Sequence, residues 1–111
     1  WLYAMISPQN EVHWSRNDYQ KIVHHSKFSA LDAFCDEKGE VSKVMPRTHW
    51  TNNFNAQGET TIVDIIAKYD SLADLEKIIE MGFNEGFTMA LENLDQYLEA
   101  SIQNRVFRKR Y

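Results

Sequence analysis

The sequence predicts an α+β fold, in which a curved antiparallel sheet of about five strands is followed by one long C-terminal helix. Between residues 1 and 69, apolar and β-branched side chains alternate in short runs separated by turn-forming residues, which is typical of strands joined by hairpins. From Leu72 onward the apolar residues recur at spacings of three and four, which is typical of a helix. Strands first and a helix afterwards favour α+β over a parallel α/β arrangement.

The five strands are expected at residues 1–6, 13–23, 28–35, 49–56 and 60–69. The first is apolar on both faces, so we expect it to be covered on both sides or to lie inside the sheet. The last, TTIVDIIAKY, is dense in β-branched residues and is the clearest strand. The connections carry turn-forming residues, with Pro8 after the first strand, Gly39 after the third and Gly58 between the last two.

The C-terminal helix is expected to be capped by Asp70 or Ser71, and Asp74, three residues past Ser71, makes a capping-box pattern. Helical periodicity continues to about residue 104. Gly82 and Gly86 each cost the helix roughly 1 kcal/mol relative to alanine. Since they are one turn apart, and Phe83 and Phe87 follow them, we expect a flat groove on one helix face. That groove would leave room for the packed sheet, for a ligand, or for both.

Size and charge exclude several classes of protein. The 111 residues fit one domain, and the net charge of −4 argues against nucleic-acid binding, which needs a basic face. No apolar run approaches the roughly 20 residues that a membrane span requires. A single cysteine, Cys35, cannot form an internal disulfide, so we expect a cytoplasmic protein in which this thiol is a small apolar side chain on a strand.

Neither metal nor acid–base chemistry has a clear signature. The four histidines lack the spacing of metal ligands, so no metal and no cofactor is expected. Asp32 and Asp64 lie on expected strands, but nothing in the sequence pairs either with a nucleophile or a histidine, and we expect both to face solvent. Phosphate-binding loops and nucleophile motifs are absent from the sequence. We therefore assign no catalytic residue and do not favour an enzyme.

Two stretches carry a resemblance to a known family: YDSLADLEKIIEMGFNEGFTMALENLDQYLE near the end, and WLYAMISP at the start. They resemble proteins similar to the C-terminal domain of the activator of heat-shock protein 90 ATPase, which belong to the START-like (SRPBCC, birch-pollen-allergen-like) superfamily. YQKIVHHSKF, FCDEKGE and QGETTIVDI fit the same family in the same order, so the resemblance covers nearly all of the chain. His24 and His25 depart from it, because the family often has Pro-Pro there.

The resemblance implies a helix-grip fold, in which the sheet curls around the terminal helix. It also implies that residues 1–111 form a single START-like domain without the family's first strand, two short helices and second strand. Such an incomplete grip would expose apolar surface. A second copy of the chain would cover that surface in a homodimer, or the chain is part of a longer protein.

START-like folds commonly hold a small apolar or amphipathic molecule between sheet and helix, and the resemblance implies such a cavity here. Its expected lining is Trp1, Tyr3, Met5, Tyr19, Phe54, Ile65, Gly82, Phe83, Gly86 and Phe87. The alternative is a fully packed core, in which these residues fill one another's gaps.

Three function hypotheses follow from this reading. The first is a non-enzymatic module that binds a small hydrophobic molecule. The second is a co-chaperone-like domain that acts on a heat-shock protein 90 ATPase. The third is an enzyme of the cyclase or hydrolase type, which uses a polar or charged residue inside the cavity.

Overall fold

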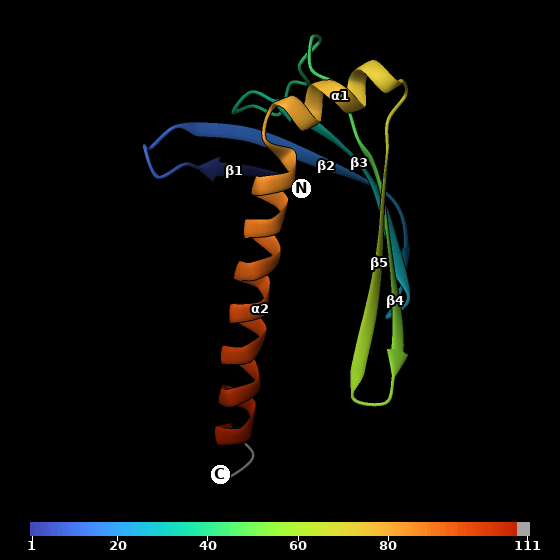
Figure 1. The fold of residues 1–111 in the computed structure, drawn as a ribbon, viewed down its shortest axis with the longest axis vertical. Coiled ribbons are helices and arrows are strands. Elements are labelled where there is room, and N and C mark those ends of the chain that lie inside the picture. The colour runs from blue at the N-terminus through green and yellow to red at the C-terminus, as the bar shows by residue number, and fades with distance from the viewer. Residues whose placement is uncertain (109–111) are drawn as a thin grey trace. The chain divides into compact units, whose positions relative to one another are not determined.

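The computed structural model describes residues 1–108, with side chains as far as Ile102. Five strands precede two helices (Figure 1). Their bounds are β1 (Leu2–Ile6), β2 (Val12–Val23), β3 (Lys27–Cys35), β4 (His49–Gln57), β5 (Thr60–Lys68), α1 (Leu72–Glu80) and α2 (Phe83–Arg108). The fold class is α+β, as expected. The chain divides into two compact units, Trp1–Leu75 with the sheet and a second that begins at Glu76.

The sheet is an antiparallel meander in the order β1-β2-β3-β4-β5, so each strand pairs with its neighbours in the chain. Each strand end lies within one residue of its expected position. Gly58 turns the β4–β5 hairpin with a φ of 64°, a conformation that glycine adopts without strain. β2 has twelve residues and a register shift between Tyr19 and Lys21 against β3. Such a bulge bends a strand, which fits the curved sheet that was expected.

The expectation for the first strand is wrong. β1 is the edge strand of the described sheet and pairs only with β2. Its apolar side chains Leu2, Met5 and Ile6 are exposed in the described chain. Within the described chain, the first strand is thus neither covered on both sides nor inside the sheet.

The registers sort the side chains of the sheet into two faces. Residues of one strand alternate between faces, and paired residues share a face. One face, called the aromatic face below, carries Tyr3, Tyr19, Phe28, Trp50 and Phe54. The opposite face carries Arg16, Asp18 and Ala33. The central strand β3 contributes one deeply buried alanine to each, with Ala30 on the aromatic face and Ala33 on the opposite face.

The helical region begins as expected, but it is not one helix. The Ser71 hydroxyl oxygen accepts a hydrogen bond from the Asp74 amide at 3.1 Å, so Ser71 is the cap of the two expected candidates, Asp70 and Ser71. α1 then ends at Glu80, and α2 begins at Phe83. Gly82 lies between them with a φ of 87°, and its amide donates to the Ile79 carbonyl at 3.0 Å. A left-handed glycine after the last turn is a common way to end a helix.

Consequently Gly82 and Gly86 do not share a helix. Gly82 ends α1, whereas Gly86 lies in the first turn of α2. The expected flat groove, made by two glycines on one helix face, is therefore not formed. The long C-terminal helix is α2 alone.

None of the helices in the described residues is both long enough and apolar enough to cross a membrane. Across the same part of the chain, no three His, Cys, Asp or Glu side chains gather in an arrangement that could hold a metal ion. The cytoplasmic location stays a prediction.

Candidate functional site

Three aromatic rings form a row across the middle of the aromatic face, one each from β2, β3 and β4. Phe28 lies between Tyr19 and Phe54, and its ring centroid is 6.0 Å from each of theirs. It meets Tyr19 edge-on and Phe54 in a stacked arrangement, both of which are favourable for aromatic pairs. Phe28 is half-buried, while Tyr19 is 48% exposed and Phe54 37% exposed. The row therefore offers apolar ring surface that the described chain does not fully cover.

A second aromatic pair lies at the β1 end of the same face. The Trp1 and Tyr3 rings stack with centroids 4.4 Å apart. Burial raises the pKa of the Tyr3 hydroxyl, and the nearby negative charge of Asp32 raises it further, while a hydrogen bond with Ser15 works against both. The hydroxyl of Tyr3 thus stays protonated well into the alkaline range.

The structure brings the six expected lining residues of the sheet onto the aromatic face. Their positions follow from the pairs Tyr3↔Ser15, Tyr19↔Ala30, Phe54↔Val63 and Asn52↔Ile65 together with the alternation along each strand. The six are Trp1, Tyr3, Met5, Tyr19, Phe54 and Ile65. Whether they line a cavity stays a prediction.

The remaining expected residues lie at and after the break between the helices. Phe83 and Phe87 stack in the first turns of α2 with ring centroids 5.3 Å apart, and both are half-buried. Gly86 is exposed, and a Cβ built there meets nothing within 4 Å. A Cβ at Gly82 would lie 3.7 Å from the Glu85 side chain, an ordinary contact, so its positive φ is what calls for glycine.

Asp32 has a structural task that the sequence did not reveal. One carboxylate oxygen accepts the Thr48 backbone N–H at 2.8 Å, and the other accepts the Trp50 indole N–H at 2.7 Å. The Asp32 amide in turn donates to the Thr48 carbonyl at 3.0 Å. Asp32 is half-buried rather than solvent-facing, so that expectation is wrong. The carboxylate fixes the start of β4 against β3.

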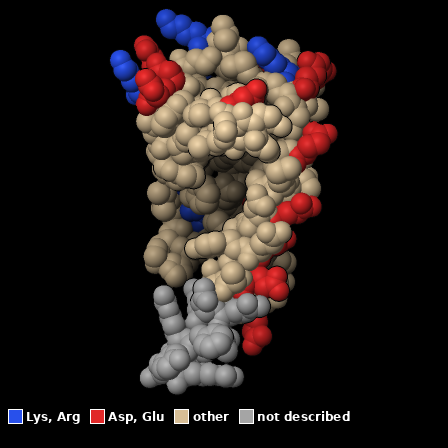
Figure 2. Space-filling view, turned by 90° about the vertical axis from the view of Figure 1, so that its left-hand side faces the viewer, with Lys and Arg blue, Asp and Glu red and all other residues tan. Residues whose placement is uncertain are grey.

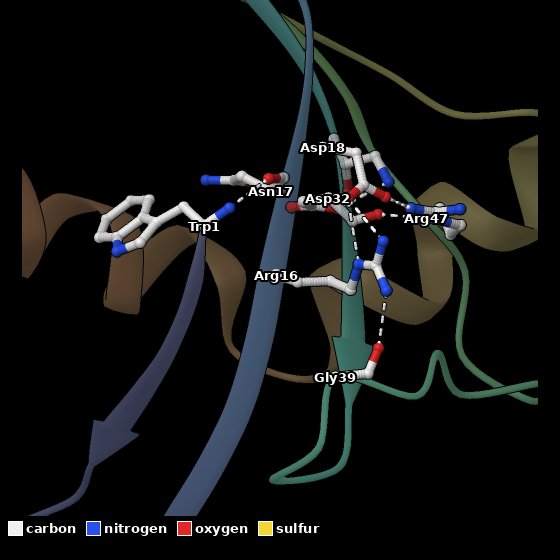
Figure 3. A network of polar contacts seen from close by, with 8 residues as sticks. Trp1, Arg16, Asn17, Asp18, Asp32, Gly39 and Arg47 are labelled. Carbon is white, nitrogen blue, oxygen red and sulfur yellow. Dashed lines mark hydrogen bonds and ion pairs between the residues drawn. The ribbon is translucent and has the colours of Figure 1, made fainter.

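A polar network occupies the opposite face (Figure 3). Arg16 donates to one Asp18 carboxylate oxygen through Nε and a terminal nitrogen, at 3.1 and 2.7 Å, and Arg47 donates to the other at 2.8 Å. The hydrogen bonds from Arg16, and after them the one from Arg47, lower the pKa of Asp18. Arg16 also donates to the Gly39 carbonyl at 2.8 Å, and Arg47 to the Asp32 carbonyl at 3.0 Å. The network thereby ties the connection between β3 and β4 to the sheet.

The two other groups of interest are a tyrosine and an acidic helix side. Among the described residues, the Tyr69 hydroxyl oxygen is buried without a hydrogen-bond partner, directly after β5. On α2, exposed acidic side chains recur on one side of the helix (Figure 2), at Glu85, Glu92, Asp95 and Glu99. Spacings of seven, three and four keep them together, as expected for a solvated face. Asp64 is also exposed, and it pairs with Asn53 on the face opposite the aromatic rings.

Comparison with known proteins gives a family and a fold. The family model described as "Activator of Hsp90 ATPase homolog 1-like protein" matches residues 1–99. Among solved structures, the crystal structure of protein Ms6760 from Mycobacterium smegmatis is similar, with a TM-score of 0.70 and 24% sequence identity; the match covers 78% of this chain and 53% of that one. This chain thus spans about half the length of the solved protein, and the likeness shows the fold. None of the curated proteins matches the chain.

Proposed function

The chain belongs to the activator of Hsp90 ATPase homolog 1-like family, within the START-like (SRPBCC) superfamily, and from that premise we propose that it is a non-enzymatic domain that binds a small hydrophobic molecule on the aromatic face of its sheet. The observation that carries this proposal is the aromatic face of the sheet. Sites for small molecules are mostly apolar and aromatic, with a few polar groups that orient the ligand.

The aromatic face has that composition. The row of Tyr19, Phe28 and Phe54 supplies exposed ring surface at the centre of the sheet. Covering such surface is favourable by roughly 25 cal/mol for each Å² of apolar area removed from water. Tyr3 and Tyr19 supply hydroxyl groups beside the rings.

Tyr69 adds a third hydroxyl. A buried hydroxyl without a partner is unfavourable, so it is a natural donor to a ligand that carries one acceptor oxygen. We therefore expect an amphipathic molecule, apolar over most of its length and carrying a single polar group, rather than a pure hydrocarbon.

The carboxylates near the sheet support a non-enzymatic function. Asp32 lies on the aromatic face, but both of its oxygens already accept hydrogen bonds from Thr48 and Trp50. Asp64 lies on the opposite face. A general acid or base needs a carboxyl group within hydrogen-bond reach of the substrate, and neither residue offers one on the aromatic side.

Thermal unfolding of the chain in the presence of dodecanoate, and separately of 1-aminoanthracene, tests the proposal. A ligand that binds only the folded state at ten times its Kd adds about 1.4 kcal/mol to the free energy of unfolding, which is a rise of several degrees in Tm. Decanesulfonate is a useful companion, because it keeps the apolar tail and changes the head group. An unchanged Tm with all three compounds would contradict binding of this class.

The family description favours one alternative, a co-chaperone-like domain that acts on a heat-shock protein 90 ATPase. A fold does not by itself carry a function, and this chain spans only part of the length of the solved relative. The alternative predicts that adding the chain changes the rate of ATP hydrolysis by the chaperone. A rate that stays constant as the chain is added in excess would remove it.

A further inference from the structure

The charged side chains of the sheet are divided unequally between its two faces. The strand registers place every Lys and Arg of the five strands on the opposite face, at Arg16, Lys21, Lys27 and Lys68. The aromatic face carries the carboxylate of Asp32, which lies opposite Asn17. We propose that the molecule bound on the aromatic face carries a cationic head group, an alkyl or aryl ammonium, and that Asp32 selects this charge. The inference rests on the proposed function.

The Asp32 carboxylate has uncharged partners on the aromatic face. It accepts hydrogen bonds from the Thr48 backbone N–H and from the Trp50 indole N–H. Arg47 donates to the Asp32 backbone carbonyl at 3.0 Å, while its terminal nitrogen pairs with Asp18 on the opposite face at 2.8 Å. None of the ion pairs within the described residues includes Asp32. A ligand that covers this half-buried carboxylate removes water from it, and a positive head group offsets that loss.

The Tyr3 hydroxyl shows how this part of the face responds to a negative charge. Its pKa is raised first by burial and next by the negative charge of Asp32, and both effects disfavour an ionised oxygen. An anionic head group in the same surroundings meets the same two effects, whereas an ammonium group is attracted by Asp32. The buried Tyr69 hydroxyl is compatible with this choice, because a phenol oxygen accepts a hydrogen bond from N–H as readily as it donates to oxygen.

The aromatic row begins beside Asp32. Tyr19 lies opposite Ala30, and Asp32 is the next residue of β3 on the same face, so Asp32 and Tyr19 are diagonal neighbours. From Tyr19 the row continues to Phe28 and Phe54, with 6.0 Å between successive ring centroids. The faces of aromatic rings attract cations. An ammonium group near Asp32 and Tyr19 therefore leaves the apolar tail to cover Phe28 and Phe54.

Isothermal titration calorimetry with three compounds that share a decyl tail tests the charge preference. Decylammonium should bind at least about tenfold more tightly than decanoate, and 1-decanol should have an intermediate Kd. Raising the NaCl concentration from about 20 mM to about 500 mM should weaken binding of decylammonium at least twofold, because salt screens the attraction to a partly exposed carboxylate. The same change should not weaken binding of 1-decanol, which carries no charge.

Two matched variants separate the effect of Asp32 from that of the net charge of −4. Asn17→Lys places a positive charge opposite Asp32 on the aromatic face, and Asn53→Lys places one opposite Asp64 on the other face. Both substitutions change the net charge equally. Asn17→Lys should weaken binding of decylammonium at least about tenfold and tighten binding of decanoate. Asn53→Lys should change each Kd by less than about threefold, with both variants folded by circular dichroism.

The outcomes distinguish this inference from the proposed function. Equal affinities for the three compounds, or tightest binding of decanoate, would overturn the charge preference and leave the binding of apolar molecules standing. Binding of none of the three would contradict the proposed function and this inference together. A preference for decylammonium that Asn17→Lys leaves unchanged would show that Asp32 does not select the head group.

Discussion

Asp18 is the residue on which the polar network of the opposite face depends. It accepts hydrogen bonds from Arg16 and Arg47, which lie two and 29 positions away in the sequence. The sequence shows that Arg16 and Asp18 are close along the chain. It does not show that Arg47 also binds the Asp18 carboxylate. Partners so far apart in the chain are set by the path of a loop, and no local pattern reports that path.

This network makes stability depend on pH in a defined direction. Because the pKa of Asp18 is lower in the folded chain than its usual value of 3.8, its ionised form stabilises the fold above about pH 4. That contribution is lost as the pH falls through the folded-state pKa. Asp18→Asn should therefore lower the free energy of unfolding at pH 7 by at most about 1 kcal/mol, since the pair is partly exposed. Urea titrations at pH 7 and pH 2.5 measure the difference.

At pH 2.5 the difference in the free energy of unfolding between the variant and the wild type should be smaller than at pH 7, because the Asp18 carboxyl is then closer to its folded-state pKa or below it. Glu59→Gln, at the exposed β4–β5 turn, is the matched control and should have little effect at either pH. A deficit of Asp18→Asn that persists undiminished at low pH would show that the carboxylate charge is not what matters.

Asp32 should matter more than Asp18, because its partners are less exposed. Asp32→Ala leaves the Thr48 amide and the Trp50 indole N–H without their acceptor, and Thr48 is buried. An unsatisfied buried donor costs about 1–3 kcal/mol, so a loss of about 2–4 kcal/mol is expected in urea unfolding. The exposed Asp64→Ala should cost less than about 0.5 kcal/mol. Similar losses for the two variants would contradict the structural task assigned to Asp32.

At the scale of elements, the break between α1 and α2 separates two glycines. Gly82 ends α1 in a left-handed conformation, whereas Gly86 is an ordinary residue in the first turn of α2. Helical spacing of the apolar residues continues across residue 82, which is why periodicity alone predicts a single helix. A glycine followed by an apolar residue, here Gly82 and Phe83, is also typical of the end of a helix, and this signal was missed. Strand positions were easier to predict, because each hairpin is local and its turn residues stand in the sequence.

Substitution of each glycine by alanine separates these roles. Gly82→Ala places a Cβ on a residue with a φ of 87° and should destabilise the fold by about 1–2 kcal/mol. Gly86→Ala improves helix propensity at a site where the added Cβ meets nothing within 4 Å, and should stabilise by up to about 1 kcal/mol. Chemical denaturation of both variants measures the signs. Equal effects from the two substitutions would contradict the break at Gly82.

At the scale of the whole molecule, the sequence predicted the fold class and an antiparallel sheet of strands joined by hairpins, and the family membership agrees with the resemblance. Six of the residues expected to line a cavity lie on one face of the sheet, and that they line a cavity stays a prediction. The sequence did not predict that β1 is an edge, because edge and interior depend on which strands are present rather than on the strand's own residues. The hydrogen bonds of Asp18 to Arg47 and of Asp32 to Thr48 and Trp50 were not predicted either, because they join residues far apart in the sequence.

Binding of 1-aminoanthracene to two matched variants tests most directly whether the aromatic face is the ligand-binding surface. Phe54→Ser removes one ring of the aromatic row, while Ile66→Ser removes an apolar side chain of comparable exposure, 47% against 37%, from the opposite face. Fluorescence titration should give a Kd at least tenfold weaker for Phe54→Ser and unchanged for Ile66→Ser, with both variants folded. Equal affinities for the two variants, or a loss confined to Ile66→Ser, would contradict the assignment.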